Sequence, residues 1–256
     1  MTMTSQLPTE LLQDVLDHPH DLEPRDRCAD WLEAHDNPWG EYIRLAVAEA
    51  RSVDRHSPDW GRHEELEKLY GTKWSAAIRP LVDRYLFARG FVEYIIISAR
   101  DFLDRAERIF AAAPVRHLQV HDLVPVAEEF FSSPYLDRLV TLIADDRLGE
   151  SDTRLLAASP HVRNLRYLSA EFGLTAEAVE TLAASPHLGK LEILDAGSTA
   201  SIREDYEWDG YLQVLVAGAP IRPSAFAQEL EARHGYKAWL HPVERFRDPV
   251  PLWSWF

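Results

Sequence analysis

Histidine and carboxylate side chains lie close together at two places in the sequence, where they could bind a metal ion or transfer protons. The two groups are His18 and His20 with Asp21, and His117 and His121 with Asp122. Imidazole and carboxylate groups are common ligands of transition metals. The second pair of histidines, however, spans a predicted strand and turn, where a spacing of four does not bring side chains to one face as it does in a helix. We therefore expect no metal site, and a metal-dependent enzyme that uses these groups stays an alternative function.

A second group of side chains could act as a catalytic acid and base. Asp30, Glu33 and Glu41 are carboxylates near Arg44, but paired charges are more often structural than catalytic. We expect Asp30 and Arg44 to form an ion pair between two helices. The single cysteine, Cys28, follows an amphipathic helical pattern and is expected to be a buried, unreactive thiol. The sequence has no glycine-rich phosphate loop and no Gly-x-Ser-x-Gly motif, so we predict a non-enzymatic protein without catalytic residues or a cofactor.

The charge and the cysteine content exclude several classes of partner. The chain of 256 residues carries 42 Asp and Glu against 27 Lys and Arg, a net charge of −15. Nucleic acids and anionic membrane surfaces both attract clustered basic residues, so we expect neither as a partner. A lone cysteine cannot form an internal disulfide, and no apolar run approaches the roughly 20 residues of a membrane-spanning helix. Since the N-terminus also lacks a signal-peptide pattern, a cytoplasmic protein is expected.

An internal repeat organises the middle of the chain. Three prolines follow one another at intervals of 26 residues, and each precedes the pattern Leu-x-x-Leu-x-Ala. The prolines are Pro134, Pro160 and Pro186, and the pattern begins at Leu139, Leu165, Leu191 and, after a shorter interval, Leu212. The pattern ends in an alternation of period two, which predicts a short strand. Residues 175–184 have helical spacing, with Thr175 as the N-cap, so strand–helix units must stack to bury their apolar faces.

Further elements are predicted on both sides of the repeats. β-Branched and aromatic residues predict a strand over 91–97, helical spacing predicts a helix over 101–112, and an irregular copy of the repeat predicts a strand over 118–120. Beyond the repeats, we expect a helix over 224–233 that Gly235 stops, and a last strand over 236–240.

The Leu-x-x-Leu-x-Ala units over residues 89–222 resemble leucine-rich repeats of the strand-plus-helix kind. The resemblance implies an α/β fold, a short solenoid of about five or six strand units. Where that family carries an asparagine or cysteine after the strand, this chain has Arg147, Gly173 and Thr199. We therefore expect the turns to be satisfied by other groups.

Residues 1–88 differ from the repeats and contain helical patterns at 11–16, 28–32, 42–50 and 63–70. They resemble a bacterial repeat-companion domain, which is named for its occurrence beside leucine-rich repeats. The matching residues are Ala29 to Glu33, Asp36, Pro38 and Glu41 to Arg44. The resemblance implies an all-helical module that caps the solenoid, with residues 223–256 as a C-terminal cap and apolar tail. That family has no general activity that could be carried over.

The alternation within each repeat strand predicts a binding surface. In leucine-rich repeats, the residues between the buried leucines face the concave side of the arc. Here they are Thr141, Ile143, Asp145, Tyr167, Ser169, Glu171, Ile193, Asp195, Val214 and Val216. Apolar and acidic side chains together suit a protein or peptide partner with basic and apolar groups. A merely solvated sheet face is the other interpretation.

Two aromatic segments extend this hypothesis. The acidic loop before the fourth repeat carries Tyr206 and Trp208, and the tail carries Trp253, Trp255 and Phe256. Aromatic side chains are common at binding hot spots and exposed apolar patches mark contacts, although both segments could instead cover the ends of the solenoid. We expect a scaffold, an inhibitor or an accessory subunit that presents a substrate to an enzyme partner. A structural subunit that joins a larger assembly through the tail is the alternative.

Overall fold

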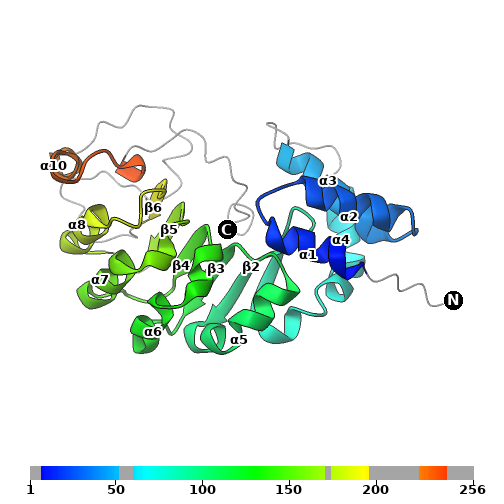
Figure 1. Cartoon of the computed structure of the whole chain (residues 1–256), viewed down its shortest axis with the longest axis horizontal. Coiled ribbons are helices and arrows are strands. Elements are labelled where there is room, and N and C mark those ends of the chain that lie inside the picture. Colours follow the sequence, from blue (N-terminus) through cyan, green and yellow to red (C-terminus); the bar gives the residue numbers. More distant parts are fainter. Residues whose placement is uncertain (1–6, 52–59, 171–173, 196–224, 241–256) are drawn as a thin grey trace. The chain divides into compact units, whose positions relative to one another are not determined.

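The fold is described from a computed structural model, in which residues 7–51, 60–170, 174–195 and 225–240 are described. The chain is a mixed α/β protein, and its described strands form a six-stranded sheet in the order β1-β2-β3-β4-β5-β6 (Figure 1). Two compact units divide the described residues: the first holds those up to 95 and 105–116, and the second holds 96–104 and those from 117 onward. Within these ranges, no helix is long and apolar enough to cross a membrane.

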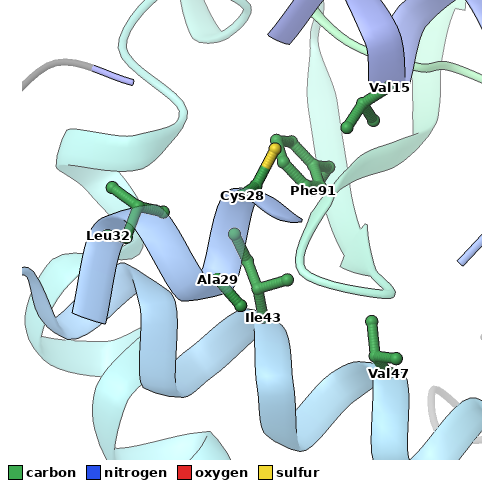
Figure 2. Packing of buried hydrophobic residues seen from close by; sticks show 7 residues of the cluster. All are labelled: Val15, Cys28, Ala29, Leu32, Ile43, Val47 and Phe91. Atoms are coloured by element: carbon green, nitrogen blue, oxygen red, sulfur yellow. The ribbon is translucent and has the colours of Figure 1, made fainter. Parts of the chain in front are cut away.

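The helices expected from apolar spacing open the first unit. They are α1 (Thr9–Asp17), α2 (Glu23–Glu33), α3 (Pro38–Arg51) and α4 (Trp60–Trp74). The apolar stripes of α1, α2 and α3 meet one residue of the sheet in a common core, whose members Figure 2 labels. They are Val15, Cys28, Ala29, Leu32, Ile43, Val47 and Phe91. This packing confirms the helical stripes predicted around Leu12 and Leu32.

The prediction of an all-helical N-terminal module is wrong, because residues 84–88 form a strand. β1 (Arg84–Ala88) and β2 (Phe91–Ser98) are neighbours in the sheet and are joined by only Arg89 and Gly90. Both turn residues have positive φ, 50° and 88°, as a type I′ hairpin turn requires. A Cβ on Gly90 would lie 2.6 Å from Cγ1 of Ile43, so the close approach of α3 also requires glycine. The expected boundary at residue 88 falls within this hairpin.

A buried charged cluster ties the hairpin to the loop between α1 and α2. Glu93 Oε1 accepts hydrogen bonds from Arg25 at 2.7 Å and Arg89 at 3.0 Å, and Arg116 lies 3.8 Å from Oε2. Arg25 and Arg89 also donate to backbone carbonyls of residues 19–21. Burial opposes the ionisation of Glu93, but the three guanidinium groups outweigh it and lower the pKa of this carboxyl.

Parallel strands place the repeats in register. β3 (His117–His121), β4 (Thr141–Ala144), β5 (Tyr167–Ala170) and β6 (Ile193–Asp195) each pair in parallel with the next. Leu118, Leu142, Leu168 and Leu194 are successive partners, and all are buried. The 26-residue interval of the sequence is therefore the register between β4, β5 and β6, which confirms the predicted repeat strands.

Helices α6 (Ala127–Phe131), α7 (Glu150–Ala158) and α8 (Ala176–Ala184) connect these strands and lie along one side of β3 to β6 (Figure 1). The strands follow one another in sheet order, and parallel crossovers are right-handed, so successive connections must fall on the same face. The predicted cap of α8 is confirmed, since Ala178 N donates to Thr175 Oγ1 at 3.1 Å. The predicted helix before β3 is also present, as α5 (Ala99–Ala112).

Serine–proline turns join each repeat to the one before it. Ser159 Oγ donates to the carbonyl of Phe131 at 2.6 Å and accepts from His161 N at 3.2 Å. Ser185 Oγ makes the equivalent bond to the carbonyl of Ala157 at 2.6 Å. The sequence predicted only that the prolines stop the helices, whereas the preceding serines also satisfy buried carbonyls of the neighbouring repeat.

The predicted last strand is wrong. The expected helix is present as α10 (Ala225–His234), and Gly235 ends it at φ 75°. Residues beyond it form a single 3₁₀ turn, η5 (Ala238–Leu240), which packs beside β6. Trp239 is buried and Tyr236 is exposed. The other 3₁₀ helices are η1 (Arg79–Leu81), η2 (Val124–Val126), η3 (Pro134–Arg138) and η4 (Pro160–Val162).

Candidate functional site

The face of β3 to β6 that lies opposite the paired leucines is the candidate site. It carries His117, Gln119, His121, Thr141, Ile143, Asp145, Tyr167, Ser169, Ile193 and Asp195. The register pairs Ile143 with Ser169 and Ser169 with Asp195, so residues at one repeat position form a row across the sheet. The structure thus brings the described members of the predicted strip together.

The expectation of an open surface is wrong for the inner part of this strip. Thr141, Ile143, Tyr167 and Ser169 are each 5% exposed or less. Parallel sheets are normally covered on both faces, and a polar member is bonded within the sheet, since His117 Nδ1 lies 2.8 Å from Thr141 Oγ1. These buried residues stabilise the sheet and do not themselves present a solvent-facing surface.

Five residues of this face remain half-buried: Gln119, His121, Asp145, Ile193 and Asp195. We call Gln119, Asp145, Ile193 and Asp195 the acidic strip. Gln119 Nε2 donates to both carboxylate oxygens of Asp145 at 2.9 Å, and Ser169 Oγ donates to Asp195 Oδ2 at 3.2 Å. The two carboxylates of the strip therefore accept hydrogen bonds from neutral donors on neighbouring strands.

The acidic strip has an electrostatic feature that sets it apart from ordinary surface charges. Burial raises the pKa of Asp145, and the neighbouring Asp146 adds to this, while the hydrogen bonds from Gln119 and the nearby His121 oppose it. A raised pKa means that the ionised carboxylate is held in a less favourable environment than in water. A cation placed beside Asp145 would relieve this cost, so the strip is suited to binding positive charge.

The turn after β4 replaces the missing asparagine of the repeat pattern with another acceptor. Leu123 N donates to Asp146 Oδ2, and Asp145 N donates to the carbonyl of Val120 at 2.9 Å. The expectation that other groups satisfy these turns is confirmed at this repeat. Asp146 is thereby a structural residue, which leaves Asp145 as the half-buried acid of the pair that faces the candidate site.

Several expected site residues lie outside the described residues. They are Glu171, Val214 and Val216 of the strip, Tyr206 and Trp208 of the acidic loop, and Trp253, Trp255 and Phe256 of the tail. Their contribution to binding stays a prediction.

The charged groups considered for catalysis form ion pairs between helices. Arg44 Nη2 lies 2.6 Å from Asp30 and 2.8 Å from Glu33, which confirms the predicted Asp30–Arg44 pair. Glu41 instead contacts Arg62 at 2.7 Å, and this contact lowers the pKa of Glu41. All of these groups are well exposed, so the arrangement holds helices together and does not resemble a desolvated acid–base pair.

Cys28 and the two groups of histidines considered as metal ligands also contact neighbouring residues of the fold. Cys28 is buried, as predicted, and burial raises the pKa of its thiol to about 12, which disfavours the reactive thiolate. His18 bonds Asp14 at 3.0 Å, and His121 bonds Asp122 at 2.9 Å. In the part of the chain that the structure describes, no three His, Cys, Asp or Glu side chains could hold a metal ion together.

Sequence reasoning missed Gln119, which fixes the carboxylate of Asp145. A signal was available, because the irregular repeat copy at Leu118 and Val120 places Gln119 at the position that Ile143 and Ser169 occupy in later repeats. A scan against protein-family models, a search of curated proteins and a search of solved structures each gave no match. The function is therefore argued from the geometry of the chain itself.

Proposed function

We propose that this protein is a non-enzymatic binding protein that holds a peptide or protein segment with basic and apolar groups on the acidic strip. The observation that carries the proposal is the half-buried carboxylate of Asp145, whose described hydrogen-bond donor is the neutral amide of Gln119. A guanidinium or ammonium group from a partner would add a full positive charge beside this carboxylate, and charge-assisted hydrogen bonds are stronger than neutral ones.

Ile193 and Asp195 extend the proposed site beyond a single charge. Ile193 offers an apolar contact on the same face, and Asp195 lies in the row of Ser169 one strand further along the sheet. A segment that alternates basic and apolar side chains would place both kinds of group against matching residues. The net charge of −15 favours the approach of a basic partner as well.

The proposed architecture is a short leucine-rich-repeat solenoid with a repeat-companion module at its N-terminal side. The 26-residue register of β4, β5 and β6 and the Ser-Pro turns that bond each repeat to its predecessor support it. Such repeats display an extended binding surface. A scaffold, an inhibitor and an accessory subunit of an enzyme all use such a surface, and we propose that the protein acts as one of these in the cytoplasm.

The proposal is tested by identifying the partner and then removing the charges. Affinity capture from a bacterial lysate with mass spectrometry would name the partner, and calorimetry would compare the native protein with the variant Asp145→Asn/Asp195→Asn. We expect the variant to bind at least about tenfold more weakly, because it removes charge pairs that are partly desolvated. Glu177→Gln is the matched control, since it removes an exposed carboxylate on α8 and should leave the affinity unchanged.

Equal affinity of the Asn variant and the native protein would refute the acidic strip as the binding site. Stoichiometric metal in the purified protein would favour the enzyme alternative instead. A salt titration adds a third criterion, because binding through the strip should weaken as ionic strength rises.

A further inference from the structure

Helix α4 carries two apolar side chains on its solvent-facing side. Leu69 is 62% exposed and the adjacent Tyr70 is 36% exposed. A single exposed leucine on a protein surface needs no explanation. Two adjacent large apolar residues on one helix, however, form a small patch that contact with another surface would remove from water.

The opposite side of α4 contacts the fold. α4 packs against α3, where the ring of Tyr42 stacks on His63 with centroids 4.3 Å apart and its hydroxyl donates to Glu67 at 2.5 Å. Successive residues of an α-helix turn by about 100° around its axis, so Leu69 lies roughly 120–160° away from His63 and Glu67. Leu69 is therefore on the face of α4 that points away from α3.

Opposite charges flank Leu69 at equal distances along the helix. Glu65 precedes Leu69 by four residues and Lys73 follows it by four, so each lies about 6 Å away along the axis and within about 40° around it. Both side chains are exposed, and Glu65 is 57% exposed even though its Oε2 accepts a hydrogen bond from Arg62 at 2.9 Å. Turning the helix end for end exchanges the acid and the base, so this face is complementary to itself.

We propose that a second copy of this chain pairs with the first through α4, with the two helices antiparallel around a two-fold axis at Leu69. Every contact of such an interface occurs twice. Leu69 and Tyr70 of both copies form its apolar centre, and each Glu65 faces the Lys73 of the other copy. A parallel pairing would instead set Glu65 beside Glu65 and Lys73 beside Lys73, and repulsion between like charges disfavours it.

The size of the face sets the strength of the pairing. α4 has 15 residues and is about 22 Å long, so one pair of such helices buries less than the roughly 1,200 Å² of a standard stable interface. The net charge of −15 on each copy opposes association as well. We therefore expect a weak dimer with a Kd of about 10–300 µM, which forms and dissociates with protein concentration.

This surface is distinct from the acidic strip, so the pairing stands whether or not the strip binds a partner. Sedimentation equilibrium of the full-length protein, at about 10–500 µM, measures its mass as a function of concentration. We expect the mass to rise from the 29.3 kDa of one chain towards twice that value. A native protein that stays monomeric over the whole range would overturn the inference.

Two substitutions test whether α4 is the interface. Leu69→Glu brings two carboxylates together at the centre, and Glu65→Lys replaces both attractive pairs by repulsive ones, so each should raise the Kd at least about tenfold. Glu64→Lys is the matched control, because it makes the same change of charge at an exposed residue roughly 140° away from Leu69. Dimerisation that survives Leu69→Glu, or that Glu64→Lys weakens as much as Glu65→Lys does, would refute pairing through this face.

Mixing two variants tests the facing of Glu65 and Lys73 directly, independently of any effect of a single substitution on folding. The Glu65→Lys chain has lysines at both positions, and the Lys73→Glu chain has glutamates at both. Each alone should be monomeric at concentrations where the native protein pairs, whereas an equimolar mixture should form a heterodimer, because each chain restores the charge pairs that the other has lost.

A mixture of Glu64→Lys with Lys73→Glu controls for general attraction between differently charged chains and should associate at least about tenfold more weakly than the first mixture. Equal association in the two mixtures, or none in the first, would contradict the proposed antiparallel arrangement.

Discussion

The buried cluster around Glu93 makes a sharp prediction about stability. Changing Glu93 to Gln keeps the size of the side chain but removes the negative charge that Arg25, Arg89 and Arg116 share. One carboxylate oxygen, which accepts hydrogen bonds, is replaced by an amide NH2, which donates them. This NH2 group would then face the N–H donors of the buried guanidinium groups. The variant leaves three buried guanidinium groups without the carboxylate around which they are arranged.

The size of the effect follows from burial. The Glu93 and Arg25 side chains are 0% exposed and Arg89 is 7% exposed, so little water can replace the lost charge. Removing one partner of such a buried pair costs about 3–5 kcal/mol. For comparison, the loss of an exposed ion pair typically lowers the free energy of unfolding by about 0–1 kcal/mol. Glu33→Gln at the exposed pair with Arg44 is therefore the matched control within the same unit.

The assay is urea unfolding at pH 7, followed by circular dichroism and by tryptophan fluorescence. Free energies of unfolding would be compared for the native protein, Glu93→Gln and Glu33→Gln. Adding Arg25→Met to the first variant should recover part of the loss, because it removes an uncompensated buried charge. Since a whole protein is stable by only about 5–15 kcal/mol, the Glu93 variant should unfold at clearly lower urea.

The pH dependence of the free energy of unfolding tests the same cluster in a second way. The pKa of Glu93 is lowered in the folded protein from its ordinary value of 4.5. The contribution of ionised Glu93 to the free energy of unfolding is therefore fully present at a pH above 4.5. It is lost as the pH falls through the lower folded pKa. The native protein and Glu93→Gln should therefore converge in acid and separate at neutral pH. A loss below about 1 kcal/mol at pH 7 would contradict the buried-pair estimate, and a separation that persists in acid would refute the assignment to ionised Glu93.

Three further predictions follow from particular contacts. Asp145→Asn should leave the free energy of unfolding at pH 7 unchanged or raise it by up to about 1 kcal/mol. The pKa of Asp145 is raised in the folded protein, so at a pH above that pKa the ionised carboxylate lowers the stability. A loss of more than about 1 kcal/mol in thermal unfolding would show instead that Asp145 stabilises the fold. Gly90→Ala should destabilise by about 1–3 kcal/mol in urea unfolding, because of its positive φ and the nearby Ile43 side chain, with Gly189→Ala, which meets no neighbour, as the control. Ser185→Ala should cost about 1–2 kcal/mol, because a buried carbonyl loses its donor, and an unchanged midpoint would show that water replaces the hydroxyl.

The repeat strands could be predicted because their signal is local and recurs. Leu142, Leu168 and Leu194 recur at a fixed interval, and parallel pairing converts that interval directly into register. The same reasoning failed for the accessibility of Thr141 and Tyr167. Alternation identifies which side chains share a face, but not which other part of the chain lies over that face.

The two errors in secondary structure have separate physical causes. Residues 84–88 were included in a helical module because its other segments have helical spacing, although Arg89-Gly90 is a hairpin turn with two positive φ angles. The segment after Gly235 has the composition of a strand, but it forms a 3₁₀ turn in which Trp239 is buried. In both places a tertiary contact decides between local alternatives that the sequence leaves nearly equal.

The long-range contact of the Glu93 cluster could not be predicted from a single sequence. Glu93 pairs with its local neighbour Arg89, but its other partner, Arg25, is 68 residues away and has acidic neighbours of its own in the sequence. Only the fold shows that Arg25 reaches the hairpin while its neighbour Arg27 pairs with Asp14 and Glu23 on the surface. Long-range charge pairs depend on packing that periodicity does not encode.

The neutral hydrogen-bond donor of Asp145 is the strongest reason to place function on the acidic strip. Several other described carboxylates of the second unit pair with arginine, as Glu192 does with Arg166 at 2.8 Å and Glu177 with Arg154 at 3.2 Å. Asp145 departs from this, because an amide fixes its carboxylate while burial raises its pKa. A carboxylate kept only for stability would gain more from an arginine at the place of Gln119. The neutral partner therefore favours a site at which the positive charge comes from another segment.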